Sequence, residues 1–176
     1  MQILKSRKLT IVLLVIILSA IGLYIFNYNP VYTAVFKTSG GAQKFPNGLQ
    51  ISIPNGSLLT DVTISVNGLT KRQRITIPVQ AKIYGSTNID LEPIASEIET
   101  IATEKFMMSV SLPLTKKASP NSDLIVLTQN NSHSNWEEVS TAHVDSSGKN
   151  ANFTVDFWGP YILSTREDLD KEFNLF

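Results

Sequence analysis

The sequence predicts an all-β fold, an antiparallel β-sandwich-like domain preceded by one N-terminal transmembrane helix. Two observations predict it. A long apolar run lies near the N-terminus, and short segments of alternating apolar and polar residues follow it. Turn dipeptides such as Asn55-Gly56 and Asn67-Gly68 separate these segments. Strands at such spacing, with no long helical pattern between them, favour an antiparallel sandwich over alternating strands and helices.

The apolar run covers residues 9–26 and carries no charged side chain. As a helix, its eighteen residues reach about 27 Å, close to the roughly 30 Å hydrocarbon core of a bilayer. The basic residues before the run favour a cytoplasmic N-terminus, so the β domain is expected to be extracytoplasmic. The residues predicted to span the membrane are Leu9, Leu13, Ile16, Ile17, Leu23 and Phe26, and those predicted to set the topology are Lys5, Arg7 and Lys8.

A cleaved signal peptide is the alternative for this segment. Signal peptides usually have a shorter apolar region that ends in a small-x-small cleavage site. Leu18 occupies the position where a small residue would be needed before Ala20. We therefore expect an uncleaved, single-pass signal anchor in contact with membrane lipid. Cleavage would instead make the domain secreted or periplasmic.

The length of 176 residues leaves room for one domain after the helix. We expect a basic tip, helix and stem over residues 1–30, a β domain over residues 31–164 and a short polar tail over residues 165–176. The fifteen basic residues balance the fifteen acidic ones, which argues against a nucleic-acid partner. The chain has no cysteine, which excludes disulfides and thiol nucleophiles.

Six segments of the predicted β domain show a period of two, and we expect at least seven strands in all. Pro78 interrupts the third segment, which indicates an edge strand or a bulge there. Two other segments are candidate helices, residues 93–103 and residues 165–176, the latter with a solvated tail as its alternative. The period-two segments are residues 49–53, 62–66, 75–83, 106–112, 124–126 and 153–157.

Residues 48–58 read GLQISIPNGSL and resemble the opening signature of the ZU-five domain, the domain shared by zonula occludens proteins and netrin receptors. Later segments resemble the same family in the same order. They are residues 89–93, 106–114, 135–137 and 153–163. The resemblance covers about residues 35–164 and implies a β-sandwich-like module that serves mainly as a scaffold for protein contacts.

Some members of that family cleave their own chain at a His-Phe-Ser tripeptide. The matching stretch here is Asp156-Phe157-Trp158. Self-cleavage needs a hydroxyl that attacks the preceding carbonyl, and Trp158 has none. The resemblance therefore implies a non-cleaving member.

No motif of a hydrolase or of a phosphate-binding loop occurs in the sequence, so we expect no enzyme activity and no cofactor. The alternative is a surface metal-dependent or hydrolytic enzyme that uses His133 and His143, the two histidines of the chain. Neighbouring carboxylates, Glu137, Glu138 and Asp145, would complete a site of two histidines and one carboxylate.

Trp158, Tyr161 and Trp136 are the candidate binding residues, because aromatic rings supply much of the contact energy at recognition sites. Core packing is the alternative for Tyr161 and Trp136, whereas Trp158, at a turn before a strand, is expected to be half exposed. The sequence thus predicts a membrane-anchored, non-catalytic structural, protein-binding or adhesive module with a protein or surface ligand of unknown identity. A further alternative has the chain dock on a partner through residues 169–176.

Overall fold

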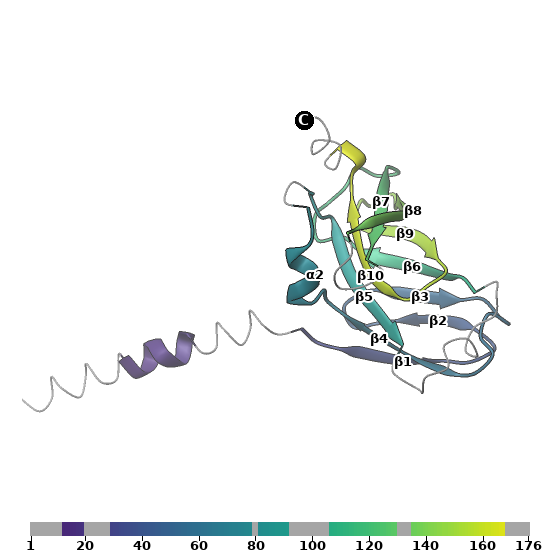
Figure 1. The fold of residues 1–176 in the computed structure, drawn as a ribbon, viewed down its shortest axis with the longest axis horizontal. Coiled ribbons are helices and arrows are strands. Elements are labelled where there is room, and N and C mark those ends of the chain that lie inside the picture. The colour runs from purple at the N-terminus through teal and green to yellow at the C-terminus, as the bar shows by residue number, and fades with distance from the viewer. Residues whose placement is uncertain (1–11, 20–28, 79–80, 92–105, 130–134, 168–176) are drawn as a thin grey trace, which may run out of the picture. The chain divides into compact units, whose positions relative to one another are not determined.

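The computed structural model describes residues 12–19, 29–78, 81–91, 106–129 and 135–167. The chain divides into two compact units, Met1–Pro30 and Val31–Phe176. The second unit holds the ten described strands and the helix α2, which Figure 1 shows in chain order. The candidate surfaces described below all belong to this second unit.

The predicted transmembrane helix is wrong. In the described part of the chain, no helix is both long enough and apolar enough to cross a membrane. The structure describes residues 12–19 of the predicted span, and they form a helical segment. Leu13, Ile16 and Ile17 lie in this segment. The other residues predicted to span the membrane or to set the topology lie outside the described residues. They are Leu9, Leu23, Phe26, Lys5, Arg7 and Lys8.

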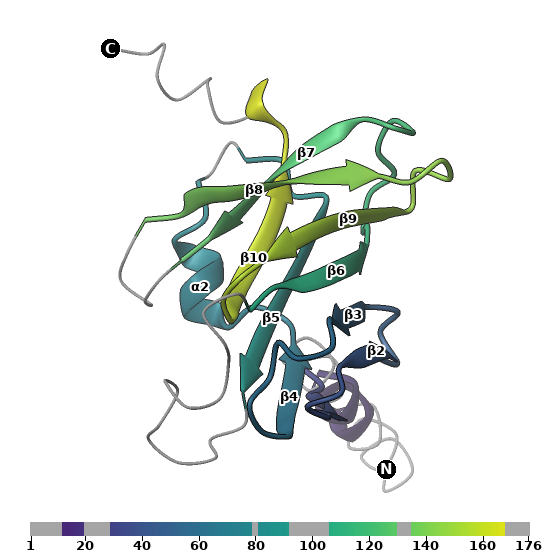
Figure 2. The ribbon, with the colours of Figure 1, turned by 90° about the vertical axis from the view of Figure 1, so that its right-hand side faces the viewer.

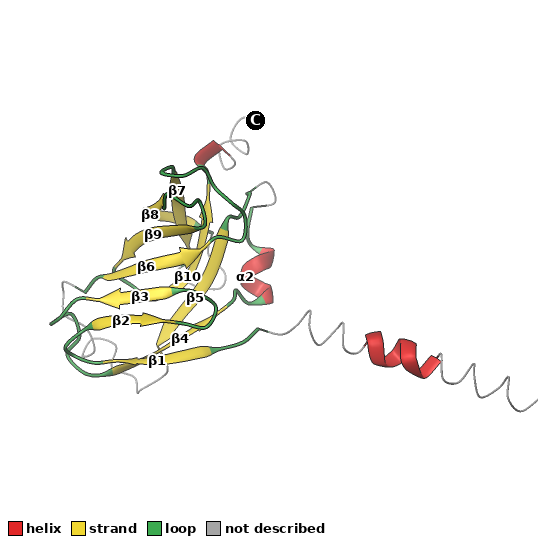
Figure 3. Cartoon of the chain, turned by 180° about the vertical axis from the view of Figure 1, so that it is seen from behind, coloured by secondary structure: helices red, strands yellow, loops and turns green. Residues whose placement is uncertain are grey.

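The strands of the second unit pair in one antiparallel sheet of order β1-β4-β5-β10-β7-β8-β9-β6-β3-β2. Figures 2 and 3 show β3, β6, β9 and β8 side by side in this sheet. The strands are β1 (Tyr32–Phe36), β2 (Gly41–Lys44), β3 (Gln50–Ile53), β4 (Val62–Asn67), β5 (Gly85–Leu91), β6 (Met108–Pro113), β7 (Asp123–Thr128), β8 (Glu137–Val144), β9 (Asn150–Val155) and β10 (Gly159–Ser164).

The all-β prediction is confirmed, but the sandwich prediction needs a correction. Two stacked sheets would interrupt the ladder, whereas backbone pairing joins the ten strands into a single sheet. The sheet folds over so that β5 contacts β6, although the two are not ladder partners. At Gly85 of β5 an added Cβ would lie only 3.2 Å from the Leu112 side chain of β6. Both architectures give the same inward and outward alternation, so the sequence pattern does not separate them.

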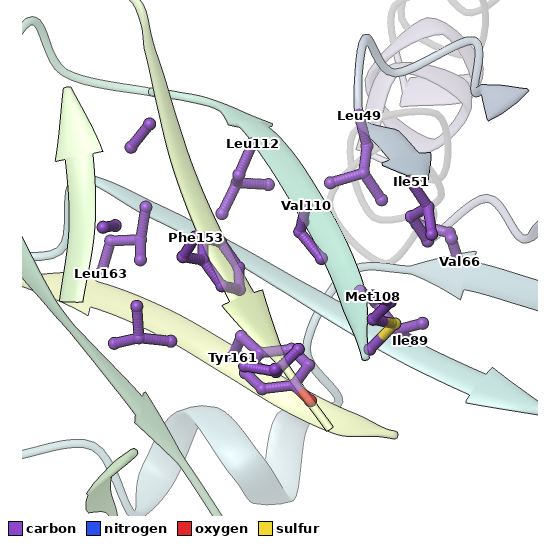
Figure 4. Close-up of a cluster of buried hydrophobic side chains, with 14 of the residues drawn as sticks. Leu49, Ile51, Val66, Ile89, Met108, Val110, Leu112, Phe153, Tyr161 and Leu163 are labelled. Carbon is purple, nitrogen blue, oxygen red and sulfur yellow. The ribbon is translucent and has the colours of Figure 1, made fainter. Parts of the chain in front are cut away.

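Inward-facing side chains from both halves of the folded sheet meet in one hydrophobic core (Figure 4). Ile51 of β3, Ile89 of β5 and Met108 of β6 are completely buried there. Phe153 of β9 packs on Tyr161 of β10, with ring centroids 5.7 Å apart. The alternating residues of the predicted segments supply this core, because every second side chain of a strand points to the same face.

The prediction of a strand over residues 75–83 is wrong, because the helix α2 (Lys71–Ile75) occupies the start of that segment. A capping box begins the helix. The Thr70 hydroxyl accepts from the Gln73 backbone N–H at 3.2 Å, and the Gln73 side chain accepts from the Thr70 N–H at 2.7 Å. Ile75 is left 73% exposed, so its apolar character does not mark an inward position.

The remaining predicted segments fall in two groups. The segments at residues 49–53, 62–66, 106–112, 124–126 and 153–157 coincide with β3, β4, β6, β7 and β9, within a few residues at their ends. The candidate helix at residues 93–103 and the docking tail at residues 169–176 lie outside the described residues.

The turn between β8 and β9 is held by the Asp145 carboxylate. One oxygen accepts from the Ser147 N–H at 3.1 Å and from the Ser147 hydroxyl at 2.8 Å, and the other accepts from the Asn150 side chain at 2.8 Å. The Asn150 and Ser147 side-chain hydrogen bonds hold the pKa of Asp145 well below its usual range. This turn connects β8 and β9, which carry three of the six residues that line the candidate site described below.

Asp145→Asn is therefore expected to destabilise the fold at neutral pH and progressively less in acid. The ionised carboxylate stabilises the folded state above the unfolded pKa of about 4, and this stabilisation is lost as the pH falls toward the lower folded pKa. Urea unfolding at pH 7 and at steps down to pH 2.5 measures the difference between wild type and variant. Glu137→Gln, on an exposed residue of β8, controls for the loss of one surface charge. A difference that is the same at every pH would contradict the prediction.

Candidate functional site

Tyr161 is a core residue. Its side chain has no exposed surface, and its hydroxyl donates to the Phe157 carbonyl four residues upstream. Burial, with a smaller contribution from the Asp156 carboxylate, raises the pKa of the Tyr161 phenol well above its usual range. A direct contact with a partner would need surface that this side chain does not have.

Trp136 lies half-buried in a second, smaller apolar cluster on the opposite face of β7 and β10. Its indole N–H donates to the Thr76 hydroxyl at 3.2 Å, and the Gln129 amide donates to the same oxygen at 3.0 Å. The cluster comprises Leu69, Ile125, Leu127 and Ile162, with Ile77 and Trp136 packed against it. Trp136 therefore fastens the segment after α2 onto the sheet.

Trp158 lies half-buried in the turn between β9 and β10, and its role as a contact residue stays a prediction. Its ring packs on the buried Phe106 ring, with centroids 4.7 Å apart at 40°. The neighbouring Phe157 ring packs on Tyr161, with centroids 5.7 Å apart. Both residues are half-buried, so the core supports one side of each ring.

A hollow of about 200 Å³ lies beside this turn, and we call it the apolar hollow. Two well-exposed apolar side chains line it, Met107 at 51% and Val139 at 39% exposure. Val139 is the extra residue of a β-bulge in β8, since Ser140 lies opposite Val126 and Glu138 opposite Leu127. The lining residues are Met107, Val139, Thr154, Val155, Asp156 and Phe157.

The apolar hollow has an acidic border. Asp156 is exposed, and its carboxylate takes part in no ion pair among the described residues. Glu138, next to Val139, is instead bound to Arg166 at 2.6 Å. The hollow thus combines an apolar surface with an unpaired negative charge, which complements a ligand carrying an apolar side chain and a nearby positive charge.

The alternative metal site is not assembled in the described residues. His143 lies 3.1 Å from the Asp123 carboxylate on the neighbouring strand, whereas His133 lies outside the described residues. Two of the three predicted carboxylates are engaged elsewhere, Asp145 in its turn and Glu138 with Arg166. No group of three histidine, aspartate or glutamate side chains within the described ranges could hold a metal ion.

None of the six residues that line the apolar hollow is among the binding residues predicted from the sequence, and Met107 and Val139 are its two well-exposed apolar ones. Each has a signal in the sequence. Met107 stands between two inward apolar residues, Phe106 and Met108, and so breaks the alternation of its segment. Val139 follows two glutamates in a strand whose inward positions start only at Ala142. Apolar residues at outward strand positions are the pattern that would have found both.

The chain matches no protein-family model and no curated protein. The resemblance of residues 35–164 to the ZU-five domain therefore stays a prediction. The same holds for the absence of self-cleavage at Asp156-Phe157-Trp158, a stretch that the structure places in the turn between β9 and β10.

Proposed function

We propose that the β unit is a non-catalytic module that binds a partner protein at the apolar hollow. The observation that carries the proposal is the exposure of Met107 and Val139 around a hollow of about 200 Å³. Protein interfaces concentrate their binding energy in a few well-packed residues, and methionine is enriched in the buried centre of such interfaces.

The geometry of the turn suits a preformed site. Phe157 is held through its contact with the buried Tyr161 ring and through its carbonyl, which accepts from the Tyr161 hydroxyl. A surface ordered before binding loses little conformational entropy when the partner docks. The resemblance to a scaffold domain agrees with such a role.

The negative charge of Asp156 favours a partner with a basic residue at the contact. The Asp156 carboxylate at the border of the hollow attracts a lysine or arginine next to the anchoring side chain. Exposed ion pairs contribute only about 0.2–1 kcal/mol, so the apolar anchor supplies most of the affinity and Asp156 chooses among ligands. The expected ligand is a polypeptide with one large apolar side chain beside a basic one.

Selection of displayed random peptides on the full chain tests this function. We expect enriched peptides to combine an apolar anchor with lysine or arginine. Met107→Asp is expected to weaken their binding about tenfold or more, since truncating a hot-spot residue costs about 2 kcal/mol or more and about 1.4 kcal/mol is tenfold. Fluorescence anisotropy with the enriched peptides measures the dissociation constants.

Leu59→Asp is the matched control, because Leu59 is an exposed apolar residue of similar exposure, 58% against 51% for Met107, away from the apolar hollow. Its variant should bind as wild type does. Enrichment of acidic peptides, or equal weakening by both substitutions, would exclude the apolar hollow as the binding site.

A further inference from the structure

A second surface of the same unit is polar and hollowed. Its volume is about 380 Å³, and it lies over β3, β6 and β9, which Figure 2 shows side by side. Six outward-pointing side chains line it, and we call them the polar face. They are Gln50, Ser52, Ser109, Ser111, Asn152 and Thr154.

The strand register arranges the polar face as two rows of three. Gln50 lies opposite Ser111, and Ser111 lies opposite Asn152. The second row, one pleat further along, contains Ser52, Ser109 and Thr154 in the same order. Neighbours across strands are about 4.8 Å apart and the rows about 6.8 Å apart, so the grid covers about 10 Å by 7 Å.

These side chains are free to bind a ligand. None of the six side chains forms a hydrogen bond among the described residues. Hydroxyl groups donate one hydrogen bond and accept two, and carboxamides donate two and accept at their oxygen. The face therefore presents both donors and acceptors in a repeating pattern on a rigid sheet.

The polar face carries no charge. Charged side chains are the usual solvent-facing residues, and the chain has fifteen acidic and fifteen basic ones, yet the hollow contains none. Lys44, a charged residue, lies opposite Gln50 at one end of the first row, and His143 lies opposite Asn152 at the other. The His143 ring lies 3.1 Å from the Asp123 carboxylate, so His143 already has a partner within the protein.

We propose that the polar face binds a neutral carbohydrate. A sugar chain has many hydroxyls that both donate and accept, and the six free groups match that chemistry, whereas an anionic or cationic polymer would find no counter-charge in the hollow. The two apolar residues that also line the hollow, Val110 and Phe153, are buried and offer little surface to an apolar peptide anchor. The site goes beyond the proposed protein-binding function, because it lies on a different set of side chains and borders the apolar hollow only at Thr154.

Backbone amide NMR of the full chain, titrated with cellohexaose, maltohexaose, chitohexaose and oligogalacturonate, tests the site. We expect saturable shifts on β3, β6 and β9 with at least one neutral sugar and none with the acidic one. Ser109→Ala/Ser111→Ala should weaken that binding about tenfold, which corresponds to about 1.4 kcal/mol. The matched control is Thr33→Ala/Ser86→Ala, two exposed hydroxyls on β1 and β5, which should bind as wild type does.

Three outcomes would overturn the proposal: no shift with any neutral sugar, shifts located elsewhere, or equal weakening in both double variants. Thermal unfolding of the two double variants shows whether either has lost its fold. Both remove two surface hydroxyl groups, so a similar and small loss of stability is expected. Met107→Asp should leave sugar binding unchanged. A peptide selected on the apolar hollow is added to the sugar complex as a final check. If the peptide abolishes the sugar-induced shifts, and Ser109→Ala/Ser111→Ala leaves sugar binding unchanged, the polar face belongs to the protein partner instead.

Discussion

Tyr161→Ala is expected to lower the free energy of unfolding by roughly 3–5 kcal/mol, the usual loss for removing a large buried ring. The side chain is completely buried and packs against Phe153 on one side and Phe157 on the other, with both pairs of centroids 5.7 Å apart. Because whole domains are stable by only about 5–15 kcal/mol, this single change removes a large share of the total. Urea unfolding of the full chain, read at constant m-value, measures the loss.

Two variants separate the contributions to this effect. Tyr161→Phe keeps the ring and removes only the hydrogen bond to the Phe157 carbonyl, so it should cost about 1–3 kcal/mol. Trp158→Ala truncates a half-buried ring in contact with Phe106 and should cost less than Tyr161→Ala. A larger loss for Trp158→Ala would contradict the assignment of Tyr161 to the core and of Trp158 to the surface.

The Tyr161 phenol also gives the fold an alkaline limit. Its folded pKa is raised by burial, so the unfolded chain releases this proton at a lower pH than the folded chain does. Stability is therefore fully present below the unfolded pKa of about 10 and falls as the pH rises above it. Tyr161→Phe should lack this fall, which distinguishes loss of the hydroxyl from a general loss of packing.

Gly40→Ala is expected to destabilise the turn between β1 and β2 more than an equivalent change at Gly56. Gly40 has a φ of 71°, and an added Cβ would lie 2.5 Å from the Ile53 carbonyl oxygen, a backbone atom that cannot move independently. The left-handed conformation costs an alanine about 1–2 kcal/mol, and relieving the clash costs about 1–3 kcal/mol more.

Gly56 supplies the matched control, because its φ of 77° is nearly the same but no atom lies within 4 Å of an added Cβ. Gly56→Ala should therefore show only the conformational cost. The two turns are bonded to each other, since the Gly56 N–H donates to the Thr38 carbonyl at 3.3 Å. Equal destabilisation of the two variants in urea would show that the approach of Ile53 to Gly40 does not constrain the turn.

The alternation of apolar and polar residues predicts β3, β4, β6, β7 and β9, but not β2, which is exposed along its length, or β10, which is almost wholly buried. Ile51 and Ile53 of β3, or Ile64 and Val66 of β4, are inward and fully or almost fully buried, and their spacing of two is visible in the chain. Residues 75–83 mislead because Ile75 is apolar but exposed, while the Thr70–Gln73 capping box, a four-residue signal, starts a helix. The joining of all strands into one sheet depends on pairings between distant residues, which no local pattern encodes.

The candidate surfaces were only partly predictable. Trp158 is an aromatic residue before a glycine and a proline, and this local context correctly places it at a half-exposed turn. The apolar hollow requires Met107 and Val139 to come together from β8 and the segment before β6. The polar face is harder still to foresee, because isolated serines look like ordinary solvent-facing residues until the register aligns them.

The central place of β10 in the sheet has a consequence for biosynthesis. This strand follows the other nine in the chain, yet it pairs with β5 on one side and β7 on the other, and its Ser164 hydroxyl bonds the Lys82 carbonyl 82 residues earlier. The two halves of the sheet cannot join until residue 164 has left the ribosome. Folding dominated by such distant pairings is slow, so the nascent chain spends its synthesis with the edges of β5 and β7 unpaired and in need of protection from aggregation.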